Sequence, residues 1–124
     1  MKSFLIAVNN GYSQGNAREV EVEDDLQAFY NLLGCEWIDI VSRKIDGRWF
    51  EIVCDDEGLL KDSPKVSAVD RMNRPMLVGN LLFFHEDGEG NLVGISDDDV
   101  VFLTRNYAFD GEDGHPVITG CEYR

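Results

Sequence analysis

The fold is decided by two apolar stretches on either side of an Asp-Gly turn: Trp37-Ile38-Asp39-Ile40-Val41, then Ile45-Asp46-Gly47-Arg48, then Trp49-Phe50-Glu51-Ile52-Val53-Cys54. Both stretches are rich in the β-branched and aromatic residues that favour strands. Asp-Gly is a strong signal for a tight hairpin turn, because the two central residues of such a turn need positive φ. The sequence therefore predicts a β-hairpin near the middle of the chain.

Towards the N-terminus the spacing of apolar residues predicts two strands and a helix. Residues 2–8 read as a buried strand, and residues 17–23 alternate at period two, so the two predict an antiparallel hairpin. Residues 24–33 change to helical spacing. Their apolar residues recur at i, i+3, i+4 and i+7, and the predicted buried face is Leu26, Phe29, Tyr30 and Leu33.

After the hairpin, residues 61–75 are expected to be irregular because Pro64 and Pro75 restrict the backbone. Residues 77–84 form the most apolar run and are expected to be the central strand, with Gly79 marking a bulge or a close backbone approach. A short extended segment is expected at residues 92–95.

A second helix is expected to begin at Ser96, with Asp99 completing a capping box. Its inward-facing residues are expected to be Val100, Val101 and Leu103. Residues 105–124 look like an acidic C-terminal extension with one added strand at residues 117–121.

These elements predict an α+β fold, a single domain over residues 1–124. It is expected to have a mainly antiparallel sheet of five to seven strands with two helices packed on it. The chain has 124 residues, of which 44% are hydrophobic, so one core can be filled without metal or disulfide.

The charge is strongly negative and unevenly distributed. The formal net charge is −13, and the middle residues 43–74 are neutral, so the excess lies in the two flanking thirds. Such a field repels nucleic acid and anionic lipid and favours basic partners. We therefore expect a protein partner with a basic surface, either a host protein or the chain itself, and neither direct nucleic-acid nor membrane binding.

A cytoplasmic location is expected from two features. The N-terminal apolar run, Phe4 to Val8, is too short for a signal peptide, and no stretch reaches the ~20 apolar residues of a membrane span. The three cysteines, Cys35, Cys54 and Cys121, are odd in number and widely spaced, as in a reducing compartment, and are expected to be ordinary buried thiols.

No catalytic site or cofactor is expected. The loop Asp87-Gly88-Glu89-Gly90-Asn91 could hold calcium, but it lacks the ligand spacing of an EF-hand and is better explained as a solvated turn. Asp97 to Asp99 could hold magnesium, yet three acids in a first helical turn already suit the helix dipole. His85 and His115 lack metal-ligand spacing, and nothing in the sequence favours a Cys54–His85 catalytic pair.

The order of these segments resembles a known family. Asp24-Asp25-Leu26-Gln27-Ala28-Phe29 leads through Gly34 to the first hairpin strand, Cys54-Asp55-Asp56-Glu57-Gly58-Leu59 follows, and Gly94-Ile95-Ser96-Asp97-Asp98-Asp99-Val100 closes the series. Over about residues 3–104 this resembles the domain of unknown function 3846 family, small proteins of phages, plasmids and gut bacteria. The resemblance implies no activity and no catalytic residues. It implies the context of a mobile element.

Two functional hypotheses follow. The first is a non-catalytic interaction protein that binds a host protein, in one form as an acidic decoy of nucleic acid in anti-defence. Alternate residues of a strand lie about 6.6–7 Å apart, near the phosphate spacing of a nucleic acid. The residues expected to form its surface are Glu19, Glu21, Glu23, Asp110, Glu112 and Asp113. The second is a nucleotide or small-molecule binder that uses the basic loop from Arg71 to Arg74, which is also a candidate partner contact.

Overall fold

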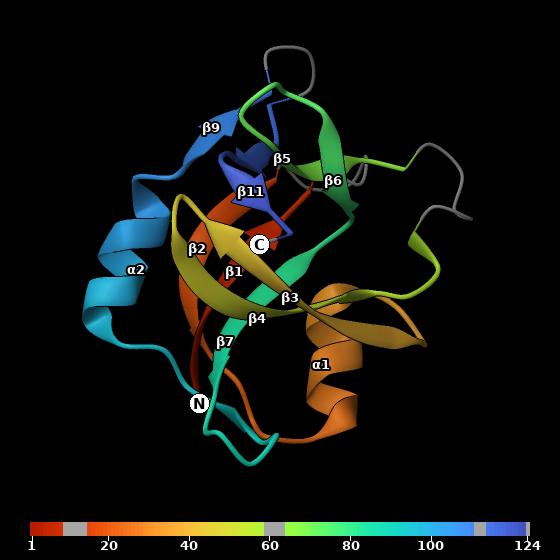
Figure 1. Ribbon diagram of the computed structural model, residues 1–124. Helices are drawn as coiled ribbons and strands as arrows, with labels where there is room; N and C mark the ends of the chain where they lie inside the picture. Colours follow the sequence, from red (N-terminus) through yellow and green to blue (C-terminus); the bar gives the residue numbers. More distant parts are fainter. Residues whose placement is uncertain (9–14, 59–63, 111–113, 124) are drawn as a thin grey trace.

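The computed structural model describes residues 1–8, 15–58, 64–110 and 114–123. These residues form two short helices and two β-sheets, and Figure 1 shows the helices at different sides of the sheets. In chain order the elements are β1 (Lys2–Ala7), β2 (Asn16–Glu21), α1 (Leu26–Leu33), β3 (Ile38–Ile45), β4 (Arg48–Asp55), β5 (Val66–Val69), β6 (Pro75–Val78), β7 (Leu81–Glu86), β8 (Leu92–Val93), α2 (Asp97–Thr104), β9 (Tyr107–Phe109), β10 (Pro116–Ile118) and β11 (Cys121–Glu122).

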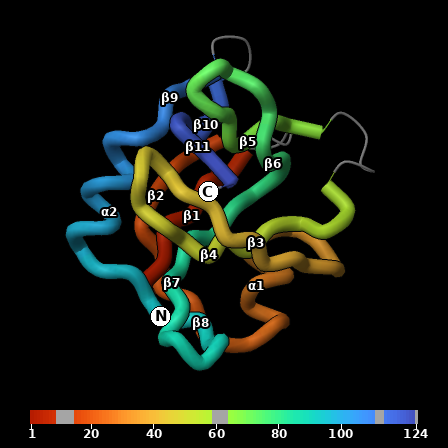
Figure 2. Tube along the Cα trace, in the orientation of Figure 1, coloured from red at the N-terminus to blue at the C-terminus, as the bar shows by residue number. Residues whose placement is uncertain are grey.

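The larger sheet has seven strands in the order β11-β3-β4-β7-β1-β2, with β8 paired to β7, and its pairs are antiparallel. The second sheet has the order β6-β5-β10-β9, and only its β10–β5 pair is parallel. Figure 2 shows β10 and β5 together in the upper part of the view. The predicted α+β class, with a mainly antiparallel sheet and two helices, is confirmed.

The central hairpin forms as the sequence predicts. Strands β3 and β4 pair over their full length, from Ile38 opposite Asp55 to Ile45 opposite Arg48. The turn residues Asp46 and Gly47 have φ of 47° and 89°. Both values are positive, as the tight turn requires.

Each face of the larger sheet has its own core. On one face α1 covers the α1-side core, to which the helix contributes Phe29 and Leu33. On the other face α2 and the second sheet cover the α2-side core, which includes Phe50, Phe83 and Leu103. The expectation that Leu26 is buried is wrong, because 56% of this residue, the first of α1, is exposed. Tyr30 is half-buried.

The secondary structure of residues 64–84 differs from the prediction. The supposedly irregular stretch contains β5, and the apolar run 77–84 is divided between β6 and β7. Gly79, with φ of 78°, lies between them and turns the chain from the second sheet into the larger one. Pro75 is tolerated because β6 is an edge strand. The central-strand prediction holds for β7 alone, which lies between β4 and β1.

The C-terminal segment contributes three strands instead of the single one expected. Gly120, with φ of 70°, interrupts the predicted strand at residues 117–121, so β10 joins the second sheet and β11 joins β3. Ile118 and Cys121 are fully buried in the α2-side core. The described residues after 104 therefore help to complete the core, although their acidic composition suggested an appendage.

Helix α2 begins as predicted. Ser96 is the N-cap, and both hydrogen bonds of the capping box with Asp99 are present. Leu103 is buried and Val100 is half-buried, but Val101 faces solvent, with 48% of it exposed, so that part of the predicted inner face is wrong. Among the described residues, no helix has the length and apolarity that crossing a membrane would need.

Candidate functional site

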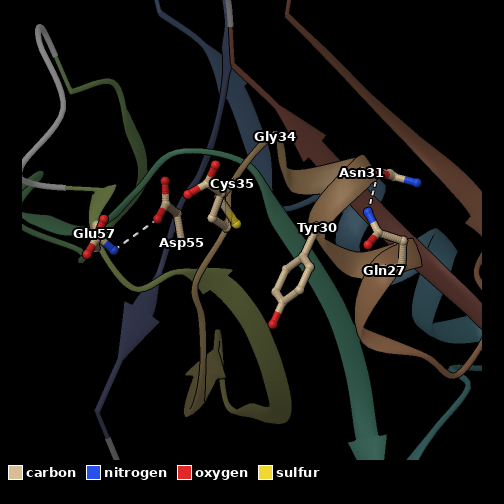
Figure 3. A pocket seen from close by; sticks show the side chains of 8 residues that line it. Gln27, Tyr30, Asn31, Gly34, Cys35, Asp55 and Glu57 are labelled. Carbon is tan, nitrogen blue, oxygen red and sulfur yellow. Dashed lines mark hydrogen bonds between the residues drawn. The ribbon is translucent and has the colours of Figure 1, made fainter.

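A cavity of about 710 Å³ lies between α1 and the C-terminal end of β4 (Figure 3). Helix α1 contributes side chains from one face, at i, i+3 and i+4. The segment after the helix and the turn after β4 form the opposite wall. The described residues that line the cavity are Gln27, Tyr30, Asn31, Gly34, Cys35, Glu36, Asp55 and Glu57.

The two ends of α1 fix the position of this wall. The Asp25 carboxylate accepts a hydrogen bond of 2.8 Å from the Ala28 amide at the start of the helix. At the other end Gly34 adopts φ of 66° and donates to the Tyr30 carbonyl at 2.8 Å. This left-handed cap, which favours glycine, ends the helix and brings the following residues Cys35 and Glu36 to the cavity.

The lining is acidic. It contains the carboxylates of Glu36, Asp55 and Glu57 and, among the described residues, no lysine or arginine. Glu36 and Glu57 are exposed, whereas Asp55 is half-buried. One oxygen of the Asp55 carboxylate accepts a hydrogen bond from the Glu57 amide at 2.9 Å. In Figure 3 Tyr30 lies between the amides of α1 on one side and Asp55 and Glu57 on the other. Carboxylates beside an aromatic ring suit a cationic group.

The predicted row of acidic side chains, Glu19, Glu21 and Glu23, forms in part. Glu19 and Glu21 are exposed on β2, opposite Phe4 and Lys2 of β1. Glu23 is exposed but lies beyond the end of β2, and its carbonyl accepts from the Asp25 amide. The structure therefore places two of the three glutamates on one strand.

A lysine partly neutralises this acidic row. The Lys2 ammonium pairs with Asp97 at the start of α2. The hydrogen bond with Asp97 raises the pKa of Lys2 above its ordinary value, and the charges of Glu19 and Glu21 raise it further. The Met1 amino group lies 3.4 Å from Glu21 Oε2. Glu19, Glu21 and Asp97 thus lie around shared cations, the Lys2 ammonium and, for Glu21, the Met1 amino group.

The acids predicted near the C-terminus do not join this group. Asp110 follows β9, beyond the C-terminal end of α2, whereas Asp97 lies at the beginning of that helix (Figure 1). The Asp110 amide donates to the His115 carbonyl at 2.8 Å, so Asp110 forms part of a turn. Glu112 and Asp113 lie outside the described residues.

The basic loop borders a second cavity of about 520 Å³, but acids pair with its guanidinium groups. Arg71 lies 3.1 Å from Asp46 and 3.3 Å from Glu122. Arg74 lies 2.8 Å from Asp70. Hydrogen bonds from the Arg74 amide, and then from the Met72 amide and the Arg74 side chain, hold the pKa of Asp70 below its ordinary value against the effect of desolvation.

Sequence reasoning missed a polar network around Asp99, which is only 6% exposed. Its Oδ1 accepts from Arg48 at 3.0 Å, and its Oδ2 contacts His85 Nε2 at 2.8 Å. The Ser96 amide and hydroxyl donate to Oδ2 at 2.9 and 3.0 Å. Burial alone would raise the pKa of Asp99, but these hydrogen bonds outweigh it and hold the pKa below its ordinary value.

Aromatic rings support both basic partners of Asp99. The His85 ring stacks on Phe50 with centroids 5.1 Å apart, and the Arg48 guanidinium lies 4.1 Å from the centre of the Phe102 ring. The Ser96 hydroxyl donates to Asp99 and not to His85, so the arrangement is not that of a serine nucleophile with its base. The network fastens the start of α2 to β4 and β7. The capping box was its only signal in the sequence.

The remaining sequence candidates have ordinary structural explanations. Burial, with a smaller effect of the nearby Asp39 charge, raises the pKa of the Cys54 thiol to about 11, and this thiol donates to the Asp39 carbonyl, not to His85. All three cysteines are buried, and none of them forms a disulfide. Asp87 accepts from the backbone amides of Glu89 and Asn91 and so shapes its own turn. In the part of the chain that the structure describes, no group of three acidic, histidine or cysteine side chains is placed to hold a metal ion.

Comparison with known proteins identifies a family but not a function. A family model described as Domain of unknown function (DUF3846) matches residues 1–108. No curated protein and no solved structure matches the chain. The matched range includes α1, the end of β4, β2 and the Asp99 network.

Proposed function

The chain belongs to the domain of unknown function 3846 family, and from its own geometry we propose that it is a non-catalytic module that binds a basic segment of another protein in the acidic cavity beside α1. The observation that carries this proposal is the lining of that cavity, with three carboxylates and no described basic side chain. Because the chain resembles small proteins of phages, plasmids and gut bacteria, the partner that we propose is a host protein.

The dimensions and chemistry of the cavity support this proposal. A volume of about 710 Å³ lies within the range of roughly 300–1,000 Å³ that is usual for ligand sites. The Glu36 and Glu57 carboxylates can accept from an ammonium or a guanidinium group, and the Tyr30 ring offers a cation–π face. The net charge of −13 adds long-range attraction for a basic partner.

The distribution of acids favours a local contact over mimicry of a nucleic-acid chain. Acidic side chains lie at several separate places, among them beside α1, on β2 with the start of α2, and in the turn between β7 and β8. Lys2 interrupts the second group. A decoy needs a continuous row of negative charges, whereas a short basic segment needs only one acidic depression.

Nucleotide binding at the basic loop is the alternative. The cavity of about 520 Å³ beside Arg71 and Arg74 favours it, because arginine binds phosphate well. Both arginines already pair with carboxylates, so an anionic ligand would have to displace Asp46, Glu122 and Asp70. We therefore rank this function second.

The test compares two double variants with equal changes in net charge. Glu36→Gln with Glu57→Gln removes two carboxylates from the cavity, and Glu86→Gln with Glu89→Gln removes two exposed carboxylates near the turn between β7 and β8. Binding of a fluorescent Lys/Arg-rich peptide is measured by anisotropy at two salt concentrations. We expect the cavity variant to lose about tenfold in affinity and the control to lose less than about twofold.

Two results would overturn the proposal. Equal losses in both variants would mean that the peptide responds only to overall charge. Tight binding of a nucleoside triphosphate that Arg71→Gln abolishes, with no peptide binding, would favour the alternative.

A further inference from the structure

Strand β2 is the last strand of the larger sheet and pairs with β1 on one side only. Such an edge leaves alternate backbone N–H and C=O groups without a partner strand. The pairing with β1 identifies the residues that carry those groups.

The hydrogen bonds of Met1 show which residues of β2 direct their backbone groups towards β1. The Val22 amide donates to the Met1 carbonyl at 2.9 Å, and the Met1 nitrogen donates to the Val22 carbonyl at 2.7 Å. Met1 and Val22 are therefore a hydrogen-bonded pair, and in an antiparallel ladder such pairs occur at every second position. The register makes Val20 and Arg18 the next residues bonded to β1. The backbone groups of Ala17, Glu19 and Glu21 point outwards from the sheet.

Glu19 and Glu21 are the accessible part of this edge. Ala17 is half-buried and packs on the α2-side core, whereas both glutamates are exposed. In the described part of the chain, the backbone groups of the two glutamates make no hydrogen bond to another segment beyond the sheet. The same two residues thus offer both open backbone groups and negative side chains.

Charge selects the strand that can pair here. Residues opposite each other in an antiparallel pair share a face, so lysine or arginine at alternate positions would stand beside Glu19 and Glu21. Lys2 of β1 already lies opposite Glu21, so a lysine or arginine of the added strand would place the Glu21 carboxylate between two positive charges on the same face of the sheet. A second copy fits poorly. When two copies of β2 pair about a twofold axis, the registers of greatest overlap place Arg18 opposite Arg18 or Glu19 opposite Glu19.

We propose that β2 is a docking edge for an extended basic segment of a protein partner, which adds to the sheet as a further strand with lysine or arginine opposite Glu19 and Glu21. The backbone groups of the two glutamates supply the hydrogen bonds, and their carboxylates select the sequence. This surface is separate from the cavity beside α1 and does not depend on it.

The experiment measures the binding of labelled peptides by anisotropy. The probe is an alternating Lys-Thr peptide, and its control is the same peptide N-methylated at alternate residues, which keeps the charge but removes the donors on one edge. Both N-methyl registers are made. The protein variants are Glu19→Gln with Glu21→Gln, Glu19→Pro, and the two charge-matched pairs described above.

We expect the Glu19→Gln, Glu21→Gln variant to lose about tenfold in affinity, and the charge-matched Glu86→Gln with Glu89→Gln to change by less than about twofold. Glu19→Pro removes an outward N–H while leaving the bonds to β1, and we expect a similar tenfold loss. One N-methyl register should bind about tenfold more weakly than the other, a result that does not depend on how well the proline variant folds.

The proposal is overturned if both N-methyl registers bind as well as the parent peptide, because the contact would then involve charge alone. It is also overturned if the Glu19, Glu21 pair weakens binding no more than the Glu86, Glu89 pair does. Concentration-dependent dimers that Glu19→Pro abolishes would show that a second copy occupies the edge instead. If the Glu36, Glu57 pair does not weaken the binding of the Lys/Arg-rich peptide while the β2 variants weaken binding of the Lys-Thr peptide as expected, only the function proposed above is contradicted.

Discussion

The carboxylates at the start of α2 and those beside α1 are chemically alike and are used in opposite ways. Asp99 is almost fully buried and accepts hydrogen bonds from Arg48, His85 and Ser96. Glu36 and Glu57 are exposed around an open cavity. A buried charge is stable only when it is paired and fully hydrogen-bonded, whereas an exposed one contributes little to folding.

The difference shows which acids are available to a partner. Replacing Asp99 would disturb the fold before it could reveal anything about binding. Replacing Glu36 or Glu57 should reveal binding without disturbing the fold. The four predictions below test this division.

The largest effect is expected for Asp99→Asn. The substitution removes the charge that faces Arg48 and leaves donors of His85 and Ser96 without their acceptor. We expect a loss of about 2–4 kcal/mol in the free energy of unfolding, measured in urea. Asp98→Asn is the matched control, because Asp98 pairs with the same arginine at 3.1 Å but is exposed, and it should cost less than about 1 kcal/mol. Equal losses would show that burial does not distinguish the two carboxylates.

Acid should reduce the difference in stability between the natural protein and Asp99→Asn. The folded-state pKa of Asp99 is held below its ordinary value, so the stability from its ionisation is present above the unfolded pKa of about 3.9 and is lost as pH falls through the folded value. Urea unfolding of both proteins between pH 5 and pH 2.5 measures the difference at each pH. A difference that stays constant over this range would mean that the charge of Asp99 is not what stabilises the fold.

The sequence predicted those parts of the fold that depend on local signals. The Asp46-Gly47 turn and the Ser96 capping box both formed, because each is specified by a few adjacent residues. The division of residues 77–84 between two sheets was missed. An apolar run looks the same whether it stays in one sheet or crosses to another, and the crossing depends on a single glycine, Gly79.

The candidate site was less predictable for a related reason. Glu36 is separated from Asp55 and Glu57 along the chain by a whole hairpin, and the pairing of β3 with β4 brings the three to one cavity. Arg48 and His85 reach Asp99 from two different strands. The exposure of Glu19 and Glu21 was predictable, because strict alternation along a strand determines which side chains face solvent.

A smaller loss is expected for His85→Phe. Phenylalanine can keep the stacking on Phe50, while the hydrogen bond of 2.8 Å to Asp99 is removed. Because Asp99 retains its other donors, we expect a loss of about 1 kcal/mol, measured by urea unfolding at pH 7. His85→Ala serves as the comparison and should cost more, since it also removes the stacking. If His85→Phe matched Asp99→Asn, the histidine and not the carboxylate would be the centre of the network.

The smallest effect is expected where the carboxylates are open. Glu36→Gln with Glu57→Gln preserves side-chain shape, and both positions are exposed, so the free energy of unfolding should change by less than about 0.5 kcal/mol. Any change should be towards greater stability, because removing two negative charges from a chain of net charge −13 reduces repulsion within the fold. Thermal and urea unfolding at low and high salt measure this. A clear loss of stability would mean that these carboxylates, like Asp99, hold the fold together, and that their exposure around the cavity does not reserve them for a partner.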